Sequence, residues 1–283
     1  FHAVALVAMS ALSGRVAAIT GAGSGIGRAM ALAFAAEGMH VALADVNEAG
    51  LAQTRNLLAS YPARIFSMRV DVSKNAEVDA FAQRCVEELG GIHVVCNNAG
   101  VFLSGPLWEH GEAEWQWLLG VNLMGVVHGV RAFAPRLIAQ DEGHIVNTAS
   151  VAGLISPPGM GAYNVSKHAV VALSESLHHD LRERGSRVGV SVLCPAYVPT
   201  AIADSRPPEP VAKSGERLVK EASLKKAVAA GKLSAEDVAR AVVAAVKENR
   251  FYVLTHPAIK GAVRARMEDV LEERAPRDPL RLK

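Results

Sequence analysis

The sequence is poor in sulfur and offers no pattern that would build a metal site or a disulfide framework. Its 283 residues include three cysteines, Cys85, Cys96 and Cys194, which are widely spaced and form no C-x-x-C pair. An odd number of cysteines at such spacing argues against both disulfides and structural zinc. We therefore expect buried free thiols, no metal ion, and a reducing compartment, that is, a cytoplasmic location.

A strong charge of either sign is also missing. Thirty basic residues against 28 acidic ones leave a net charge of +2, and no basic run stands out. This excludes the electrostatic footprint of a nucleic-acid-binding protein. The start, "FHAVALVAMSALSGRV", has neither the basic region of a signal peptide nor the roughly 20 apolar residues of a membrane span. We expect no export and no membrane partner, and we interpret residues 1–8 as an N-terminal extension or expression remnant before Met9.

What the sequence does contain is a regular alternation of apolar strand-like runs and helical runs. The strand-like runs cover 15–20, 40–45, 64–71, 92–100, 143–150, 187–195 and 251–254. The helical runs cover 25–37, 47–59, 75–89, 162–184, 234–248 and 257–273, with a further helical region reaching into 121–139. Continuous rather than alternating apolar strands are typical of a parallel sheet buried on both faces. Residues 9–283 are therefore predicted to form one α/β domain, a Rossmann-type doubly wound parallel sheet flanked by helices.

One stretch breaks this rhythm. After Pro195 the sequence passes through "RPPEP" at 206–210 and a polar, lysine-bearing segment at 211–232. We expect an excursion at about 201–232 that acts as a mobile lid over a substrate. Ser234 is predicted to cap the next helix, with Asp237 at the third helical position.

The first strand leads into a turn dense in glycine, "TGAGSGIG" at 20–27. Glycines let a backbone approach a pyrophosphate, and the following helix N-terminus offers free N–H groups to it. The spacing departs from G-x-G-x-x-G because position 26 is Ile. We expect Gly21, Gly25 and Gly27 to serve the phosphate, although a purely steric need for glycine would give a similar turn.

Asp45 ends the second strand, where a carboxylate would accept hydrogen bonds from the adenosine ribose hydroxyls. Its charge would repel a 2′-phosphate, so NAD is the expected cofactor rather than NADP. The alternative is that Asp45 merely caps the helix that begins near Asn47. That alternative leaves the upstream glycines unexplained.

The motif "YNVSK" places Tyr163 and Lys167 four residues apart, on one face of a helix. A nearby ammonium favours the phenolate, which lowers the ordinary tyrosine pKa of about 10 and permits acid/base catalysis. A chance pairing of the two residue types is the alternative. Ser150 ends the strand "HIVNTAS" at the sheet edge where open α/β sheets bind ligands, and Asn122 precedes that strand in a helix from which it could link Lys167 to water.

Together these features resemble the short-chain dehydrogenase/reductase family over residues 12–256. The resemblance rests on "TGAGSGIG", Asp71-Val72, "NNAG" at 97–100, Asn122, Ser150, "YNVSK" and "CPAYVPT" at 194–200. It implies a catalytic tetrad of Asn122, Ser150, Tyr163 and Lys167. It also implies a cofactor site formed by Gly21, Ser24, Gly25, Ile26, Gly27, Asp45, Asp71, Val72, Asn98, Ala99, Gly100, Tyr163, Lys167, Pro195, Val198 and Thr200.

The resemblance further implies a homotetramer or homodimer, with the helices that carry Asn122 and Tyr163 at an interface. One position departs from the family pattern, because Ala196 replaces the usual glycine after Pro195. This leaves cofactor binding intact but makes the adjoining substrate wall less predictable.

The expected substrate pocket is apolar and is assigned to Val151, Leu154, Met160 and Tyr197. These residues favour a hydrophobic secondary alcohol or its ketone, converted by hydride transfer to or from NAD. Two other functions fit the same fold, namely a non-catalytic dinucleotide-binding redox sensor and a reductase of 3-oxoacyl thioesters. The complete tetrad argues against the sensor, and Asp45 argues against the NADP preference expected of the thioester reductase.

Overall fold

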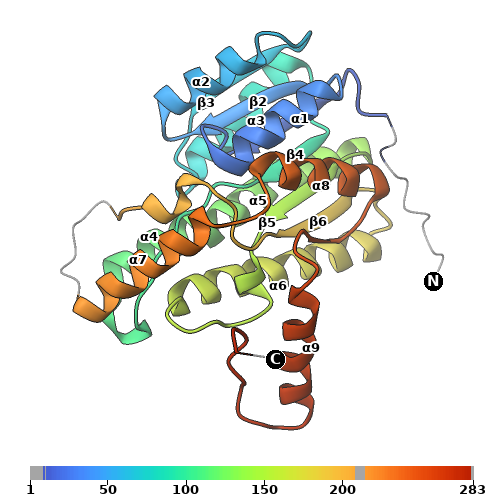
Figure 1. Cartoon of the computed structure of the whole chain (residues 1–283). Helices are drawn as coiled ribbons and strands as arrows, with labels where there is room; N and C mark the ends of the chain where they lie inside the picture. Colours follow the sequence, from blue (N-terminus) through green and yellow to red (C-terminus); the bar gives the residue numbers. More distant parts are fainter. Residues whose placement is uncertain (1–8, 10, 208–213, 282–283) are drawn as a thin grey trace.

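The chain folds around one parallel sheet of seven strands, which a computed structural model describes for residues 9, 11–207 and 214–281 (Figure 1). The strand order is β3-β2-β1-β4-β5-β6-β7, and every neighbouring pair is parallel. The strands are β1 Val16–Thr20, β2 His40–Asp45, β3 Ile65–Arg69, β4 Val94–Asn97, β5 His144–Thr148, β6 Gly189–Cys194 and β7 Tyr252–Leu254. This confirms the predicted doubly wound α/β fold.

Helices cover both faces of the sheet. They are α1 Gly25–Ala36, α2 Glu48–Leu58, α3 Asn75–Leu89, α4 Glu112–Leu119, α5 Gly125–Gln140, α6 Gly161–Glu183, α7 Gly215–Ala229, α8 Ala235–Glu248 and α9 Ile259–Leu271. Short turns of helix occur at η1 Leu107–Glu109, η3 Val151–Gly153 and η4 Ala201–Asp204, and a π-helical turn, η2 Gly120–Met124, joins α4 to α5. The predicted cap of α8 is confirmed, because Ser234 accepts a hydrogen bond from the backbone N–H of Asp237.

Successive residues of each strand are buried against opposite layers. Ala17 and Ile19 of β1 pack toward the core under α1, α2 and α8, whereas Val16 and Ala18 pack toward the core under α3, α5 and α6. Both layers exclude water, which explains why the strands have continuous apolar runs. The two layers are visible on either side of the sheet in Figure 1.

The strand order reverses between β1 and β4, which are neighbours in the sheet. The connections that leave these two strands run in opposite directions. A crevice therefore forms between the carboxyl ends of β1 and β4. In open α/β sheets this crevice is the ligand-binding position. The fold therefore places the glycine turn after β1 beside the "NNAG" segment that follows β4.

The segment predicted as a mobile lid contains helix. It includes η4 and α7, and of α7 only Arg217 and Val228 are buried. A helix that buries an arginine instead of an apolar stripe gives no periodic hydrophobic signal, so the sequence pattern missed it. The interpretation of residues 1–8 concerns a stretch outside the described residues, as does the part of the lid at 208–213.

The helical run Glu112–Gln140 is long and apolar enough by composition to cross a membrane. Half of its most apolar window is buried inside the fold. The run comprises α4, η2 and α5, which pack against α3 and α6.

Candidate active site

The glycine turn after β1 has a backbone that only glycines fit. Gly21 and Gly25 have φ angles of 68° and 49°, in the left-handed region. A Cβ on Gly27 would lie 2.0 Å from the carbonyl oxygen of Gly21, so any side chain there would push α1 away from the turn. Ser24, the N-cap of α1, makes no side-chain capping bond, which leaves first-turn N–H groups available to an anion.

Asp45 fastens this turn to the end of β2. Its Oδ2 accepts a hydrogen bond from the Gly23 backbone N–H at 2.8 Å, and its Oδ1 accepts one from Asn47 at 2.9 Å. The N-cap of α2 is Asn47, whose side chain accepts from the Gly50 N–H. Capping α2 is therefore not the role of Asp45, which instead lines the cleft beside the glycines.

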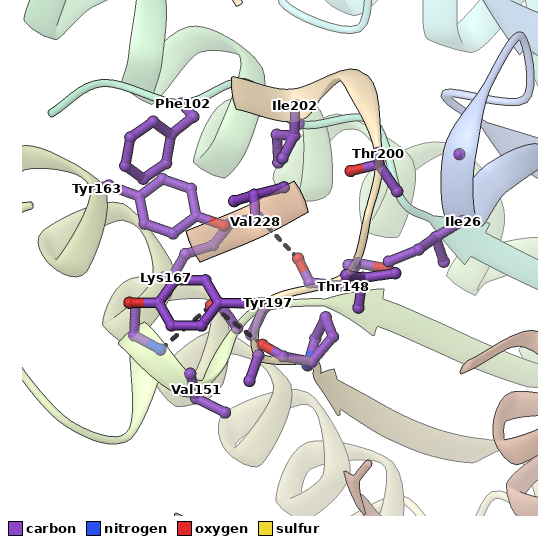
Figure 2. Close-up of a pocket in the computed structure, with 18 of the residues that line it drawn as sticks. Ile26, Phe102, Thr148, Val151, Tyr163, Lys167, Tyr197, Thr200, Ile202 and Val228 are labelled. Carbon is purple, nitrogen blue, oxygen red and sulfur yellow. Dashed lines mark hydrogen bonds between the residues drawn. The ribbon is translucent and has the colours of Figure 1, made fainter. Parts of the chain in front are cut away.

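Tyr163 and Lys167 lie together in the first turns of α6, as the four-residue spacing predicts. Both are almost completely buried, and the Lys167 ammonium lies 5.7 Å from the centre of the Tyr163 ring. Lys167 Nζ donates to the Thr148 carbonyl oxygen at 2.9 Å (Figure 2). Ser150 follows β5, and its Oγ donates to the Pro195 carbonyl oxygen at 3.3 Å while accepting from the Ala152 N–H at 3.2 Å.

Burial dominates the electrostatics of this pair. It raises the pKa of Tyr163 to about 12, and a hydrogen bond with Ser150 opposes this increase. Burial also lowers the pKa of Lys167 to about 8. The sequence-based expectation that Lys167 pulls the tyrosine pKa below its ordinary value is therefore wrong for the polypeptide alone, in which desolvation is the larger effect.

The side chain of Asn122 is occupied by the segment that follows β4. Its Oδ1 accepts from the Val101 N–H at 2.8 Å, and its Nδ2 donates to the Val101 carbonyl at 2.9 Å and to Ser166 Oγ at 3.1 Å. Gly100 lies between Asn122 and the lysine, because a Cβ there would be 3.4 Å from Asn122 Oδ1 and 3.5 Å from Lys167 Nζ. Asn122 does not line the cleft itself.

Most of the residues predicted for the site line one continuous cleft with Tyr163. Besides Ser150, Lys167 and Asp45, they are Gly21, Ser24, Gly25, Ile26, Gly27, Asn98, Ala99, Gly100, Val151, Met160, Pro195, Tyr197, Val198 and Thr200. Asn98 also fastens the glycine turn, because its Nδ2 donates to the Thr20 carbonyl at 3.1 Å.

Besides Asn122, three predicted residues are not among those that line this cleft. Asp71 accepts hydrogen bonds from the backbone N–H and the hydroxyl of Ser73, at 3.0 and 2.7 Å. Val72 is buried against Gly125. Leu154 packs instead with the cluster that contains Val170.

Large apolar side chains that the sequence pattern did not indicate also line the cleft, namely Phe102, Ile155, Leu224, Val228, Ile259 and Leu280. The Phe102 ring lies 4.7 Å from the Tyr163 ring, centre to centre, so it supports the phenol from one side. Figure 2 shows Phe102, Ile202 and Val228 around the space that the Tyr163 hydroxyl faces. Phe102 directly follows "NNAG" and Val101, the one sequence signal that could have indicated it.

In the described part of the chain, no group of three or more histidine, cysteine, aspartate or glutamate side chains is placed to hold a metal ion. Cys85, Cys96 and Cys194 are buried and free, as expected. The cleft thus combines an anion-accepting turn, a carboxylate and a buried phenol–ammonium pair.

Comparisons with known proteins agree with this geometry. The sequence profile described as short chain dehydrogenase matches residues 15–210. A crystal structure of a short chain dehydrogenase/reductase from Burkholderia phymatum in complex with NAD has 52% sequence identity and a TM-score of 0.94, with 97% of this chain and 100% of that chain covered.

Two curated relatives extend over most of both chains. A CLA biosynthesis dehydrogenase/reductase from Lactiplantibacillus plantarum is 32% identical, covering 93% of this chain and 95% of its own. A 1-deoxy-11-beta-hydroxypentalenate dehydrogenase from Streptomyces exfoliatus is 35% identical, covering 92% and 89%. With its Rossmann-type sheet and these relatives, the chain belongs to the short-chain dehydrogenase/reductase family of oxidoreductases.

Proposed function

We propose that this protein transfers a hydride between NAD(H) and a hydrophobic secondary alcohol or its ketone. One observation carries the proposal. The buried Tyr163 phenol, with Ser150 and Lys167 beside it, shares an otherwise apolar cleft with the glycine turn and Asp45. A proton-transferring group and a dinucleotide cradle in one cleft are what hydride transfer requires.

The residues around the turn fit a dinucleotide. Gly21 and Gly25 hold the turn in a left-handed backbone conformation, and Gly27 lets α1 pack closely against it. The first turn of α1 would then offer N–H donors to a pyrophosphate. Asp45 would accept hydrogen bonds from the adenosine ribose hydroxyls, while Lys167 would reach the nicotinamide ribose. NAD, when bound, supplies the acceptor or donor of the hydride. The NAD complex of the Burkholderia phymatum relative supports this choice of cofactor.

Tyr163 is the proposed general acid/base. During oxidation its phenolate oxygen accepts the proton of the alcohol hydroxyl, and during reduction its phenol returns a proton to the developing alkoxide. Ser150, which shares a hydrogen bond with the phenol, would hold the substrate oxygen beside it. The Lys167 ammonium stabilises the phenolate form electrostatically, with the Thr148 carbonyl fixing its position.

The lining of the cleft supports an apolar substrate. Its charged side chains are Asp45 and Lys167, both assigned above to the cofactor. Around the Tyr163 hydroxyl the walls are formed by apolar side chains that include Phe102, Ile202 and Val228 (Figure 2). A carboxylate or phosphate group on the substrate would find no cationic partner among these residues.

We further propose a homotetrameric or homodimeric enzyme of the cytoplasm. The apolar side chains of Met124, on η2, and Val165, on α6, are 41% and 49% exposed. They lie on the helical elements that carry Asn122 and Tyr163, where the family resemblance locates an interface. Sedimentation velocity of the purified protein would test the assembly.

The charge of Asp45 is expected to select NAD over NADP. Asp45→Asn keeps the size of the side chain but removes the charge that would repel a 2′-phosphate, so NADPH affinity should improve relative to NADH by about tenfold or more. Fluorescence titration with both reduced cofactors measures the ratio. An unchanged ratio would show that Asp45 acts only on the glycine turn, through Gly23.

The raised pKa of Tyr163 gives the two directions opposite pH dependence. Because burial raises this pKa to about 12, the phenolate needed for oxidation becomes more populated as pH rises from neutrality. Oxidation should therefore accelerate toward alkaline pH, whereas reduction, which uses the protonated phenol, should not. Measuring kcat/KM for an alcohol and its ketone across this range tests the assignment. An oxidation rate that declines as pH rises from neutrality to the Lys167 pKa of about 8, where the ammonium is still present, would contradict it.

Turnover itself is tested by mixing the protein with NAD and each of a panel of aliphatic, aromatic and cyclic secondary alcohols and following the absorbance of reduced nicotinamide. Activity with apolar members of the panel is the expected result. Activity confined to carboxylate-bearing alcohols would overturn the substrate class.

A further inference from the structure

The chain does not leave the molecule after α9 but turns back toward the cleft. Figure 1 shows the C-terminal segment running back beside α9. Leu280 from this segment and Ile259 from the start of α9 line the same cleft as Tyr163. We call residues 274–281 the C-terminal tail.

The reversal is a defined backbone turn. Glu273 has a φ of 52°, in the left-handed region that glycine normally occupies. The Arg274 N–H donates to the Asp269 carbonyl at 2.8 Å and the Glu273 N–H to the Val270 carbonyl at 3.3 Å, which is the Schellman pattern of helix termination. A non-glycine residue in this conformation carries a strain that other contacts must offset.

Those contacts come from a buried carboxylate. Asp269 is 4% exposed; its Oδ2 accepts from the Arg277 backbone N–H at 3.0 Å and its Oδ1 from Arg277 Nε at 2.7 Å. Arg277 Nη2 also donates to the Ala265 carbonyl at 2.8 Å. The Asp269 carboxylate thus holds both the backbone N–H and the side chain of Arg277, which fixes the middle of the tail on α9.

A last turn carries the tail to the cleft. Asp278 Oδ1 accepts from the Leu280 N–H at 2.9 Å, and the Asp278 carbonyl accepts from the Arg281 N–H at 3.1 Å. Pro276 and Pro279 restrict the backbone on either side of Arg277 and Asp278. Leu280 keeps 59% of its surface exposed, although it lines the cleft. It therefore has apolar surface available to a ligand.

Covering α9 does not explain this arrangement. Val270 and Leu271 of α9 remain 59% and 79% exposed with the tail in place. Ile155 lines the cleft and also, with Pro276 and Pro279 of the tail, a neighbouring hollow along α9. The anchored tail thus adds apolar surface to the substrate end of the site.

We propose that the C-terminal tail forms the outer wall of the substrate site and selects alcohols or ketones whose apolar substituent extends from the reacting carbon to Leu280. This inference rests on the proposed function, because it assigns the substrate end of the same cleft. Short substrates would not reach Leu280 and would be indifferent to it. Extended ones would bury its exposed surface.

The test compares the wild type with Leu280→Ala, with a truncation after Arg274, and with Leu271→Ala as a matched control for an exposed leucine outside the cleft. Binding of methyl ketones with short, medium and long alkyl chains is measured by calorimetry on protein saturated with NAD, a combination that cannot react. Affinity should rise with chain length in the wild type and the control. Leu280→Ala should weaken the longest ketone by about fivefold to tenfold and leave the shortest unchanged.

Asp269→Asn and Arg277→Met should reproduce this loss by releasing the tail, with NADH affinity unchanged. The proposal is overturned if Leu280→Ala and the truncation keep the wild-type dependence on chain length, or if no ketone binds the wild type. Alcohol turnover is measured separately. Its absence together with length-dependent ketone binding would refute the proposed reaction while leaving the tail in its role as a specificity wall.

Discussion

Tyr163→Phe is expected to lower kcat by about a hundredfold to ten-thousandfold, because the variant keeps the ring but has no group to accept or donate the proton. The phenylalanine ring would still pack against Phe102, whose ring centre lies 4.7 Å from that of Tyr163. Folding and NADH affinity should therefore be nearly unchanged. Steady-state rates and NADH titration on the same preparation separate the chemical effect from a binding effect.

Phe102→Leu is the matched control for this experiment. It alters packing beside the phenol but leaves the hydroxyl and its hydrogen bond with Ser150 in place. A modest change in KM is expected, with most of kcat retained. If Tyr163→Phe loses no more activity than Phe102→Leu, then the tyrosine is a packing residue and the acid/base assignment is wrong.

Breaking the ion pair between Arg217 and Glu114 should cost about 3–5 kcal/mol of the free energy of unfolding, the amount typical for a buried charge left without its partner. Arg217, on α7, and Glu114, on α4, have fully buried side chains, and both guanidinium Nη atoms donate to the carboxylate. Burial opposes ionisation of Glu114, yet the hydrogen bond and charge of Arg217 hold the pKa of Glu114 below its ordinary value. The ion pair should therefore contribute to the free energy of unfolding at neutral pH, and this contribution should be lost as pH falls through the lowered pKa of Glu114.

Arg217→Met, Glu114→Gln and the double variant test this pair in urea unfolding, with Lys226→Met as an exposed control on the same helix. Each single variant should strongly lower the free energy of unfolding, and the double variant should lower it by less than the sum of the two single effects. The control should lower it by less than about 0.5 kcal/mol. Because α7 carries Leu224 and Val228 over the cleft, hydrogen exchange in α7 should rise with the loss. Singles that behave like the control would show that α7 does not depend on this pair.

The parts of the site that the sequence could predict are those encoded locally. The glycine turn follows from positions where a Cβ has no room, such as Gly27, and the Tyr163–Lys167 pair follows from helix geometry. The strands were predictable because burial on both faces leaves continuous apolar runs. Each of these signals spans only a few residues.

The rest depends on contacts between distant segments. Helix α7 is held in place by the ion pair of Arg217 with Glu114, which lies 103 residues away in the sequence. No local sequence pattern predicts such a pair. Leu280 reaches the cleft because the chain reverses direction after α9. The left-handed residue of this turn is Glu273 and not a glycine, so the sequence gives no turn signal there. Leu154 has the apolar character of a pocket residue but packs in the layer with Val170, because composition does not fix which side of a turn faces a cavity.

Hydride transfer is tested most directly by following the hydrogen itself. The protein is incubated with NAD and apolar secondary alcohols of the panel that carry deuterium on the carbinol carbon. The nicotinamide product is then analysed by mass spectrometry and NMR. Deuterium is expected at C4 of the reduced nicotinamide in the wild type, and almost none with Tyr163→Phe. Tight NADH binding with no transfer from any alcohol of the panel would contradict hydride transfer and favour a dinucleotide-binding redox sensor.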